Sequence, residues 1–177
     1  EGPNVRLNFI LSQVDGHRQL QQGLCDVLLS PVEHEYETLY RCNLWRDRYV
    51  CVMREGHPLA QQPITLDDYL GARHVQMTYQ NGWKPLYWSA SELVGHKLDI
   101  ALRVHNTAIY TRILDGTDYL MTIPERIARK LGANYCVQPT PFKSDFTLYL
   151  YWTKLTHQSR AHQWLREQIR LLSSRLA

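Results

Sequence analysis

The stretch from Asp47 to Leu59 constrains the fold more than any other part of the chain. Its apolar run over residues 48–54 predicts a buried strand, and Gly56 and Pro58 predict a turn directly after it. Thr65 then caps a short helix that begins a new group of elements. A buried strand followed by a turn and a new helix predicts that the chain crosses here from one lobe to a second lobe. Clefts between lobes commonly bind small molecules, so the same stretch predicts where a ligand would bind.

The rest of the sequence alternates between strand and helix patterns. Strands are predicted over residues 5–13, 24–30, 39–44, 48–54, 74–79, 98–104, 119–123, 135–137 and 146–152. Helices are predicted over residues 15–23, 65–70, 86–95, 125–131 and 159–176, with a further helix that Asn106 or Thr107 caps and that ends at Leu114. Glycines at positions 23, 95 and 132 are expected to stop three of these helices. The alternation predicts an α/β fold with mostly parallel sheets that are covered on both faces.

Size and charge narrow the class of protein. With 177 residues, of which 44% are hydrophobic, the chain is long enough for one or two domains with a core of their own. No apolar run approaches the roughly 20 residues that a membrane-spanning helix needs. The first residues, Glu1 to Asn4, lack the features of a signal peptide, so we expect a cytoplasmic protein without a membrane partner. A net charge of +3 is too small to predict a nucleic-acid-binding face on this chain.

Residue types that carry chemistry are sparse. The four cysteines are Cys25, Cys42, Cys51 and Cys136. Their spacing fits no metal site, which favours reduced thiols in a protein core. The sequence contains no GxSxG, HExxH, GxGxxG or P-loop motif, and its one dense acidic and imidazole cluster, residues 33–35, lies in a predicted surface loop. We therefore expect no catalytic residue, no metal and no cofactor.

Candidate ligand contacts stand where predicted strands end and helices begin. This pattern selects Ser30, Thr78, Tyr79, His105, Asn106 and Thr107. The last three precede a predicted helix, whose free N–H groups favour an anion such as a carboxylate. Capping of that helix explains Asn106 and Thr107 equally well. Planar apolar walls for a ligand are available from Trp83, Tyr87 and Trp88.

Four segments of the chain resemble a known family. They read RYVCVMREGHPLA, PITLDDYL, DGTDYLMTIPERIARKL and LYLYWTK followed by SRAHQWLREQI. Together they resemble the effector-binding domain of LysR-type transcriptional regulators. Within that family, the sequence looks closest to the branch that senses aromatic acids and flavonoids, the naphthalene-degradation and nodulation activators.

The resemblance implies a two-lobed fold of the periplasmic-binding-protein type 2 class. Residues 1–50 and 143–177 would form lobe I, and residues 51–142 would form lobe II. Similar domains have a further strand and helix before the segment that matches residues 5–13, so lobe I is expected to be incomplete at its N-terminus. The DNA-binding domain of such regulators, a winged helix-turn-helix, is also expected to be absent from this chain.

The resemblance adds two candidate contacts and a function. His74 occupies the position where aromatic-acid-sensing relatives have a histidine in the effector pocket. The alternative interpretation of His74 is a core histidine whose hydrogen bonds are made within the protein. Thr122 matches a position that lines the cleft in the family. The implied function is effector sensing without catalysis, in a homodimer or homotetramer that binds DNA only through the domain missing here. The effector would be small and aromatic or carboxylate-bearing. A stand-alone solute-binding protein of the same fold is the main alternative, and an enzyme on the same frame is a third possibility.

Overall fold

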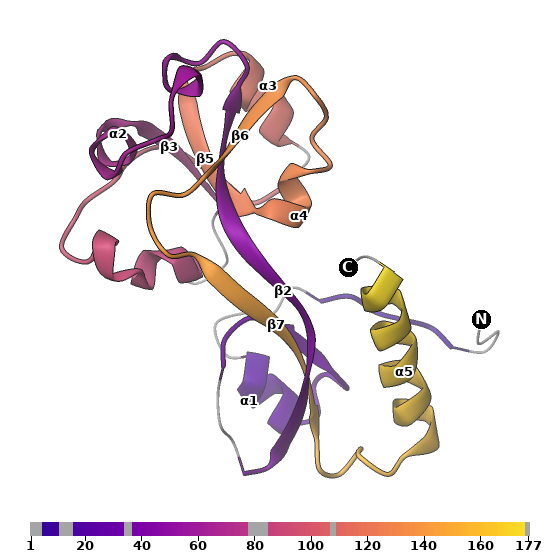
Figure 1. Ribbon diagram of the computed structural model, residues 1–177. Helices are drawn as coiled ribbons and strands as arrows, with labels where there is room; N and C mark the ends of the chain where they lie inside the picture. Colours follow the sequence, from indigo (N-terminus) through magenta and orange to yellow (C-terminus); the bar gives the residue numbers. More distant parts are fainter. Residues whose placement is uncertain (1–4, 11–15, 34–36, 78–84, 107–108, 176–177) are drawn as a thin grey trace.

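The computed structural model describes residues 5–10, 16–33, 37–77, 85–106 and 109–175. Figure 1 shows two groups of elements joined by two long strands, β2 (Leu39–Arg54) and β7 (Asp145–Thr153). These strands pair antiparallel from Leu39 opposite Thr153 to Arg48 opposite Asp145. The crossing strand that the sequence predicts is therefore present, and its partner is the returning strand near the C-terminus.

The smaller group, here called the β1 half, is built on the ends of β2 and β7 that pair with each other. β1 (Leu28–Ser30) extends this sheet by pairing antiparallel with β7. α1 (Gly16–Gln21) packs on it through Leu20, which is completely buried with Leu28 and Tyr151. α5 (Arg160–Arg175) lies beside β2 and is held by the buried Arg166, whose guanidinium lies 4.7 Å from the centre of the Trp152 ring.

The larger group, here called the β5 half, contains the other end of β2. β5 (Tyr119–Pro124) and β6 (Tyr135–Pro139) each pair antiparallel with β2 residues 49–54. β3 (Arg73–Met77) is parallel to β5 and to β4 (Asp99–Val104). The strand order is β1-β7-β2-β5-β3-β4, with β6 also paired to β2.

The sheet is therefore mixed, and the expectation of mostly parallel sheets describes only β3, β4 and β5. Parallel neighbours need crossover connections, which the β5 half provides through its helices. β2 and β7 instead carry the chain into and out of the β5 half in opposite directions, so their pairings are antiparallel.

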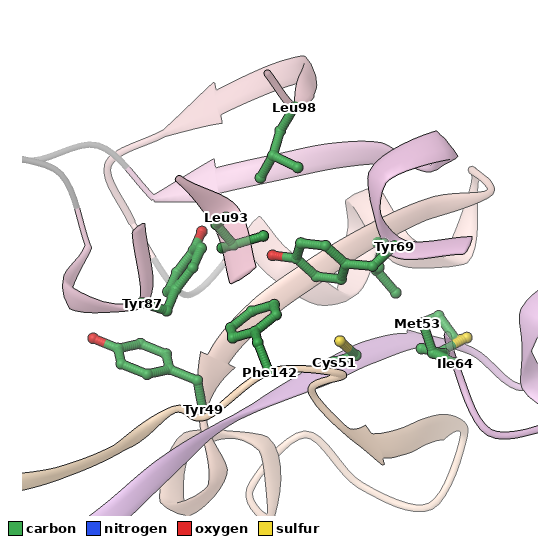
Figure 2. Packing of buried hydrophobic residues seen from close by; sticks show 10 residues of the cluster. Tyr49, Cys51, Met53, Ile64, Tyr69, Tyr87, Leu93, Leu98 and Phe142 are labelled. Carbon is green, nitrogen blue, oxygen red and sulfur yellow. The ribbon is translucent and has the colours of Figure 1, made fainter. Parts of the chain in front are cut away.

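Helices cover both faces of the sheet in the β5 half. Successive side chains of β2 point to opposite faces of the sheet. On one face, Cys51 and Met53 pack with α2 (Leu66–Gly71). On the other face, Val50 and Val52 pack with α3 (Tyr110–Asp115) and α4 (Glu125–Ala128). Side chains of a strand point alternately to opposite faces, and here both faces are buried, so the apolar run has no polar interruption. Figure 2 shows the first cluster, in which Phe142 lies 5.0 Å from the ring of Tyr69.

Local signals in the sequence account for several boundaries. Thr65 caps α2 in a capping box, since its hydroxyl accepts from the Asp68 backbone N–H while the Asp68 carboxylate accepts from the Thr65 N–H. Gly132 has a left-handed backbone, φ 95°, which glycine adopts without strain, but α4 ends before this predicted stop, at Ala128 with Arg129 as its C-cap residue. α5 spans the predicted C-terminal helix almost end to end. No helix in the described part of the chain has the length and apolar character to cross a membrane.

Other predicted elements differ from the structure. Residues 39–44 and 48–54 form one continuous strand, because β7 supplies a partner along its length apart from a register shift between Asn43 and Trp45. The predicted helix over 86–95 is instead two 3₁₀ turns, η3 (Leu86–Ser89) and η4 (Ser91–Leu93). The Ser89 hydroxyl donates to the Leu86 carbonyl, a local bond that competes with regular helix. A further 3₁₀ turn, η1 (Pro58–Gln61), follows β2.

The predicted strand over 5–13 is wrong for residues 5–10, which have no regular secondary structure; residues 11–13 lie outside the described residues. Val5, Leu7 and Phe9 keep the alternating apolar pattern of a strand, yet all three are exposed, Phe9 to 86%. A strand is stable only when a neighbour satisfies its backbone hydrogen bonds. Among the described residues, no strand pairs with this segment.

Candidate functional site

A pocket of about 610 Å³ takes its lining from both halves of the molecule, and it is called the junction pocket here. One wall consists of Pro31 and Glu33, in the turn after β1, together with Thr147 and Tyr149 of β7. The two 3₁₀ turns and the segment leading into β7 form the other. The lining residues are Pro31, Glu33, Tyr49, Leu86, Tyr87, Ser89, Ala90, Ser91, Glu92, Lys143, Ser144, Asp145, Phe146, Thr147 and Tyr149.

Glu33 binds two neighbouring side chains in the wall that the β1 half contributes to the pocket. Its carboxylate accepts a hydrogen bond from the Arg41 guanidinium at 2.5 Å and a second from the Tyr149 hydroxyl at 3.1 Å. The same guanidinium lies 4.9 Å from the centre of the Tyr149 ring. The hydrogen bond from Arg41, assisted by that from Tyr149, lowers the pKa of Glu33, so this carboxylate stays ionised at neutral pH.

Aromatic rings and a second carboxylate form the wall of the β5 half. The Tyr49 ring lies 5.0 Å from Tyr87 and 5.0 Å from Phe146, and Figure 2 shows Tyr49 and Tyr87 side by side at the edge of the core. Glu92 accepts hydrogen bonds from the Lys143 backbone N–H at 3.3 Å and from the Ser91 hydroxyl at 2.9 Å. Its bond to its own backbone N–H and these two neighbours lower the pKa of Glu92.

Asn106 and His105 lie elsewhere, in an open pocket of about 480 Å³ that they line with Val104, Ile109 and Arg112. α3 begins at Tyr110, with Ile109 as its N-cap residue. Residues 107 and 108 lie outside the described residues, so a helix cap at Asn106 or Thr107, and an anion held there, stay predictions.

His74 and Thr122 are core residues joined through Tyr69. The Thr122 hydroxyl is hydrogen-bonded to the Tyr69 hydroxyl at 2.8 Å. His74 Nε2 lies 2.8 Å from the Tyr69 carbonyl oxygen, which can only accept, so this nitrogen carries the proton. Burial lowers the pKa of His74 and raises the pKa of the neighbouring Cys51 thiol to about 12. Neither side chain lines the junction pocket.

The predicted contacts thus fall in separate places. Ser30 is buried and accepts a hydrogen bond from the Val32 N–H at 3.1 Å in the turn that carries Pro31 to the junction pocket. Thr78, Tyr79 and Thr107 lie outside the described residues. Whether any of these side chains contacts an effector stays a prediction.

Sequence reasoning missed the polar lining of the junction pocket, above all Glu92, Lys143 and Tyr149. Lys143 and Tyr149 lie next to or in the crossing strand β7, whereas no sequence signal marks Glu92. Glu33 was interpreted as part of a solvated loop; it is exposed, and its carboxylate is bonded to Arg41 and Tyr149. No group of three or more histidine, cysteine, aspartate or glutamate side chains among the described residues is placed to hold a metal.

A model of the LysR substrate binding domain matches residues 1–172 of this sequence. The chain belongs to the LysR substrate-binding domain family. The fold and the family that the sequence resemblance predicted are both confirmed.

Named relatives of this LysR domain are regulators. The transcriptional activator NahR of Pseudomonas putida is 26% identical over 94% of the chain and 57% of its own length. Nodulation protein D 1 of Rhizobium tropici is 27% identical over 100% of the chain and 59% of its own length. Both belong to the branch that the resemblance predicted. The LysR domain spans about half the length of the curated relatives it matches.

The fold comparison agrees with the family match. The regulatory domain of MexT, a transcriptional activator in Pseudomonas aeruginosa, superposes with a TM-score of 0.72 at 24% identity, covering 87% of this chain and 76% of that one. This likeness establishes the two-lobed fold of the LysR domain.

Proposed function

We propose that this chain is the effector-sensing part of a bacterial LysR-type transcription regulator, and that a small aromatic molecule binds in the junction pocket. The observation that supports the proposal is that both halves of the molecule contribute residues to the lining of the junction pocket. Glu33 and Tyr149 come from one half, whereas Tyr87 and Glu92 come from the other. A ligand that contacts both walls favours one arrangement of the halves over others, which is what a sensor requires.

The dimensions and surfaces of the pocket fit a small aromatic ligand. Its volume of about 610 Å³ is within the usual range for small-molecule sites. Tyr49, Tyr87 and Phe146 offer apolar planar surface, and rings pack well against rings in offset or edge-to-face geometry. Carboxylates and hydroxyls around these rings supply the polar groups that fix the orientation of a ligand.

The properties of the whole protein follow from the family and are part of the proposal. DNA recognition would reside in a part of the regulator outside this chain, since the curated relatives are about twice as long. The regulator would act in the cytoplasm as a homodimer or homotetramer and would have no catalytic activity. Residues 1–50 with 143–177 would form lobe I and residues 51–142 lobe II, in keeping with the change of partner along β2 near Tyr49. The regulator relatives favour this function over that of a stand-alone solute-binding protein.

A pocket-filling variant tests the proposed site. Ser89 is exposed and lines the junction pocket, so Ser89→Trp places an indole where the ligand would bind. Ser174→Trp, on the exposed part of α5, is the matched control. Thermal-shift measurements with a panel of aromatic compounds should find at least one that stabilises the native chain, by about 2.7 kcal/mol at a hundredfold excess over its dissociation constant.

We expect Ser89→Trp to abolish this stabilisation and Ser174→Trp to preserve it. If a stabilising compound acts equally on both variants, the ligand binds outside the junction pocket and the proposed site is wrong. In a full-length regulator, Ser89→Trp should remove the transcriptional response to the compound while operator binding is retained.

A further inference from the structure

The junction pocket has an excess of acidic side chains over basic ones. Glu33, Glu92 and Asp145 contribute three carboxylates to the described lining, and Lys143 contributes the one ammonium group. Arg41 lies behind this wall and is bonded to Glu33. Even when Arg41 is included, carboxylates outnumber cations among the described residues of the lining.

Two of these carboxylates are fixed in place and stay ionised. Arg41 and Tyr149 hold Glu33 from the β1 half, and the Lys143 backbone N–H and the Ser91 hydroxyl hold Glu92 from the β5 half. Hydrogen bonds to the charged form lower the pKa of both groups. A carboxylate has about four lone-pair sites, so Glu33 keeps acceptor capacity after two donors, and Glu92 after three.

Lys143 does not reverse this balance. Its exposed side chain belongs to the same residue whose backbone N–H binds Glu92, and its charge acts on that carboxylate. The ammonium group is therefore already near an anion. A ligand carboxylate, which offers acceptors and no donors, would meet Glu33, Glu92 and Asp145 as like charges.

We propose that the junction pocket selects aromatic molecules that carry an ammonium group, accepts neutral aromatic hydrogen-bond donors less tightly, and discriminates against aromatic carboxylates. This inference rests on the proposed function, since it assumes that the effector occupies this pocket. An ammonium group donates hydrogen bonds to the spare acceptor sites of Glu33 and Glu92. It is also attracted to the faces of the Tyr49, Tyr87 and Phe146 rings.

Three compounds with one phenol ring provide a direct test. Tyramine carries an ammonium group, 4-ethylphenol is neutral and 4-hydroxyphenylacetate carries a carboxylate. Calorimetric titration of the native chain at pH 7 and low salt should give the tightest binding for tyramine and the weakest for the acid, with a gap of about tenfold or more between them. The gap should shrink as salt is added, because the charges line an open pocket.

Charge variants show whether the lining causes the order. Glu92→Gln and Asp145→Asn should each weaken tyramine several-fold and leave 4-ethylphenol nearly unchanged. Glu167→Gln, on the exposed face of α5, is the matched control and should change neither compound. Lys143→Gln should tighten tyramine and weaken the acid further.

The outcomes separate this inference from the proposed function. If the acid binds as tightly as tyramine and Ser89→Trp blocks it, the pocket is the site but the charge selection is overturned. The same holds if tyramine binds but is indifferent to Glu92→Gln and Asp145→Asn. If none of the three compounds binds, or if Ser89→Trp blocks none of them, both the selection and the proposed site are overturned.

Discussion

Replacing Thr122 with valine separates a structural role of this side chain from contact with an effector. Thr122 is only 7% exposed, and its hydroxyl is hydrogen-bonded at 2.8 Å to the hydroxyl of the fully buried Tyr69. Valine keeps the shape of the side chain but leaves the Tyr69 hydroxyl without this partner. An unsatisfied buried hydroxyl costs about 1–3 kcal/mol. For a chain of this size, that cost corresponds to a fall of roughly 3–9 °C in the melting temperature.

A double-mutant cycle with Tyr69→Phe isolates the interaction. Each single variant leaves one hydroxyl without its partner, whereas the double variant removes both. We therefore expect the double variant to be less destabilised than the sum of the singles, with a coupling of about 0.5–3 kcal/mol. Thr122→Ser keeps the hydroxyl and controls for loss of the methyl group. Circular dichroism during heating and during urea unfolding would measure the stability of all five proteins: the unmodified chain, the two single variants, the double variant and Thr122→Ser.

Ligand titration completes the test, because Thr122 was also a predicted effector contact. A core role predicts that Thr122→Val binds stabilising compounds almost as well as the unmodified chain once both are folded. The core interpretation is refuted if Thr122→Val melts at the unchanged temperature and yet loses ligand binding. In that case the hydroxyl acts on the ligand and not on Tyr69.

Three further predictions concern the protonation, reactivity and capping of side chains in the β5 half. Burial lowers the pKa of His74 below its usual value of 6.5, so the unfolded chain binds a proton before the folded chain does, and the stability of the fold should decrease as the pH falls below about 6.5. His74→Gln should make stability less dependent on pH in this range. An unchanged pH dependence would contradict the lowered pKa of His74. Cys51, buried and with its thiol pKa raised to about 12, should resist alkylation in the native chain and react only after unfolding, as peptide mass spectrometry would show. Thr65→Ala removes the N-cap of α2 and should cost about 1 kcal/mol in urea unfolding, whereas Thr65→Ser should cost much less.

Sequence patterns predicted best the elements whose signals are local. The helix cap at Thr65 and the apolar run before Gly56 each depend on neighbouring residues, and each is present in the structure. The apolar run also predicted burial on both faces, because β2 has no polar position between Tyr49 and Met53. These features needed no knowledge of distant partners.

Features that depend on distant partners were predicted poorly. The alternating residues 5–10 have the pattern of a strand but lack a paired neighbour among the described residues, and the pattern cannot report that. Residues 39–54 were predicted as two strands that end at Leu44 and begin again at Arg48, whereas β7 also pairs with the polar Arg46 and Asp47 between them. Pairing with β7 outweighs the local preference of these polar residues.

The candidate site was the hardest part to predict for the same reason. His74 and Thr122 have the residue types of a polar site, but their position on central strands places them under α2, where they bind Tyr69. The junction pocket takes its lining instead from turns that adjoin the crossing strands, and charged residues in turns are normally solvated. Glu33 from one half and Glu92 from the other line the same pocket only because the fold brings distant segments together.

If the junction pocket is the effector site as proposed, contacts of the crossing strand determine which parts of the molecule a ligand acts between. Arg48 on β2 forms a two-pronged ion pair with Glu125 of α4, both bonds at 3.1 Å, and Arg126 lies 5.2 Å from the ring of Trp45. These contacts fasten the crossing part of β2 to the β5 half. A ligand at Glu33 and Glu92 therefore acts between the β1 half and a unit that already includes the crossing strand. A ligand can shift the equilibrium between two arrangements of the halves only to the extent that it binds one arrangement more tightly than the other. A tenfold difference in affinity shifts that equilibrium by about 1.4 kcal/mol.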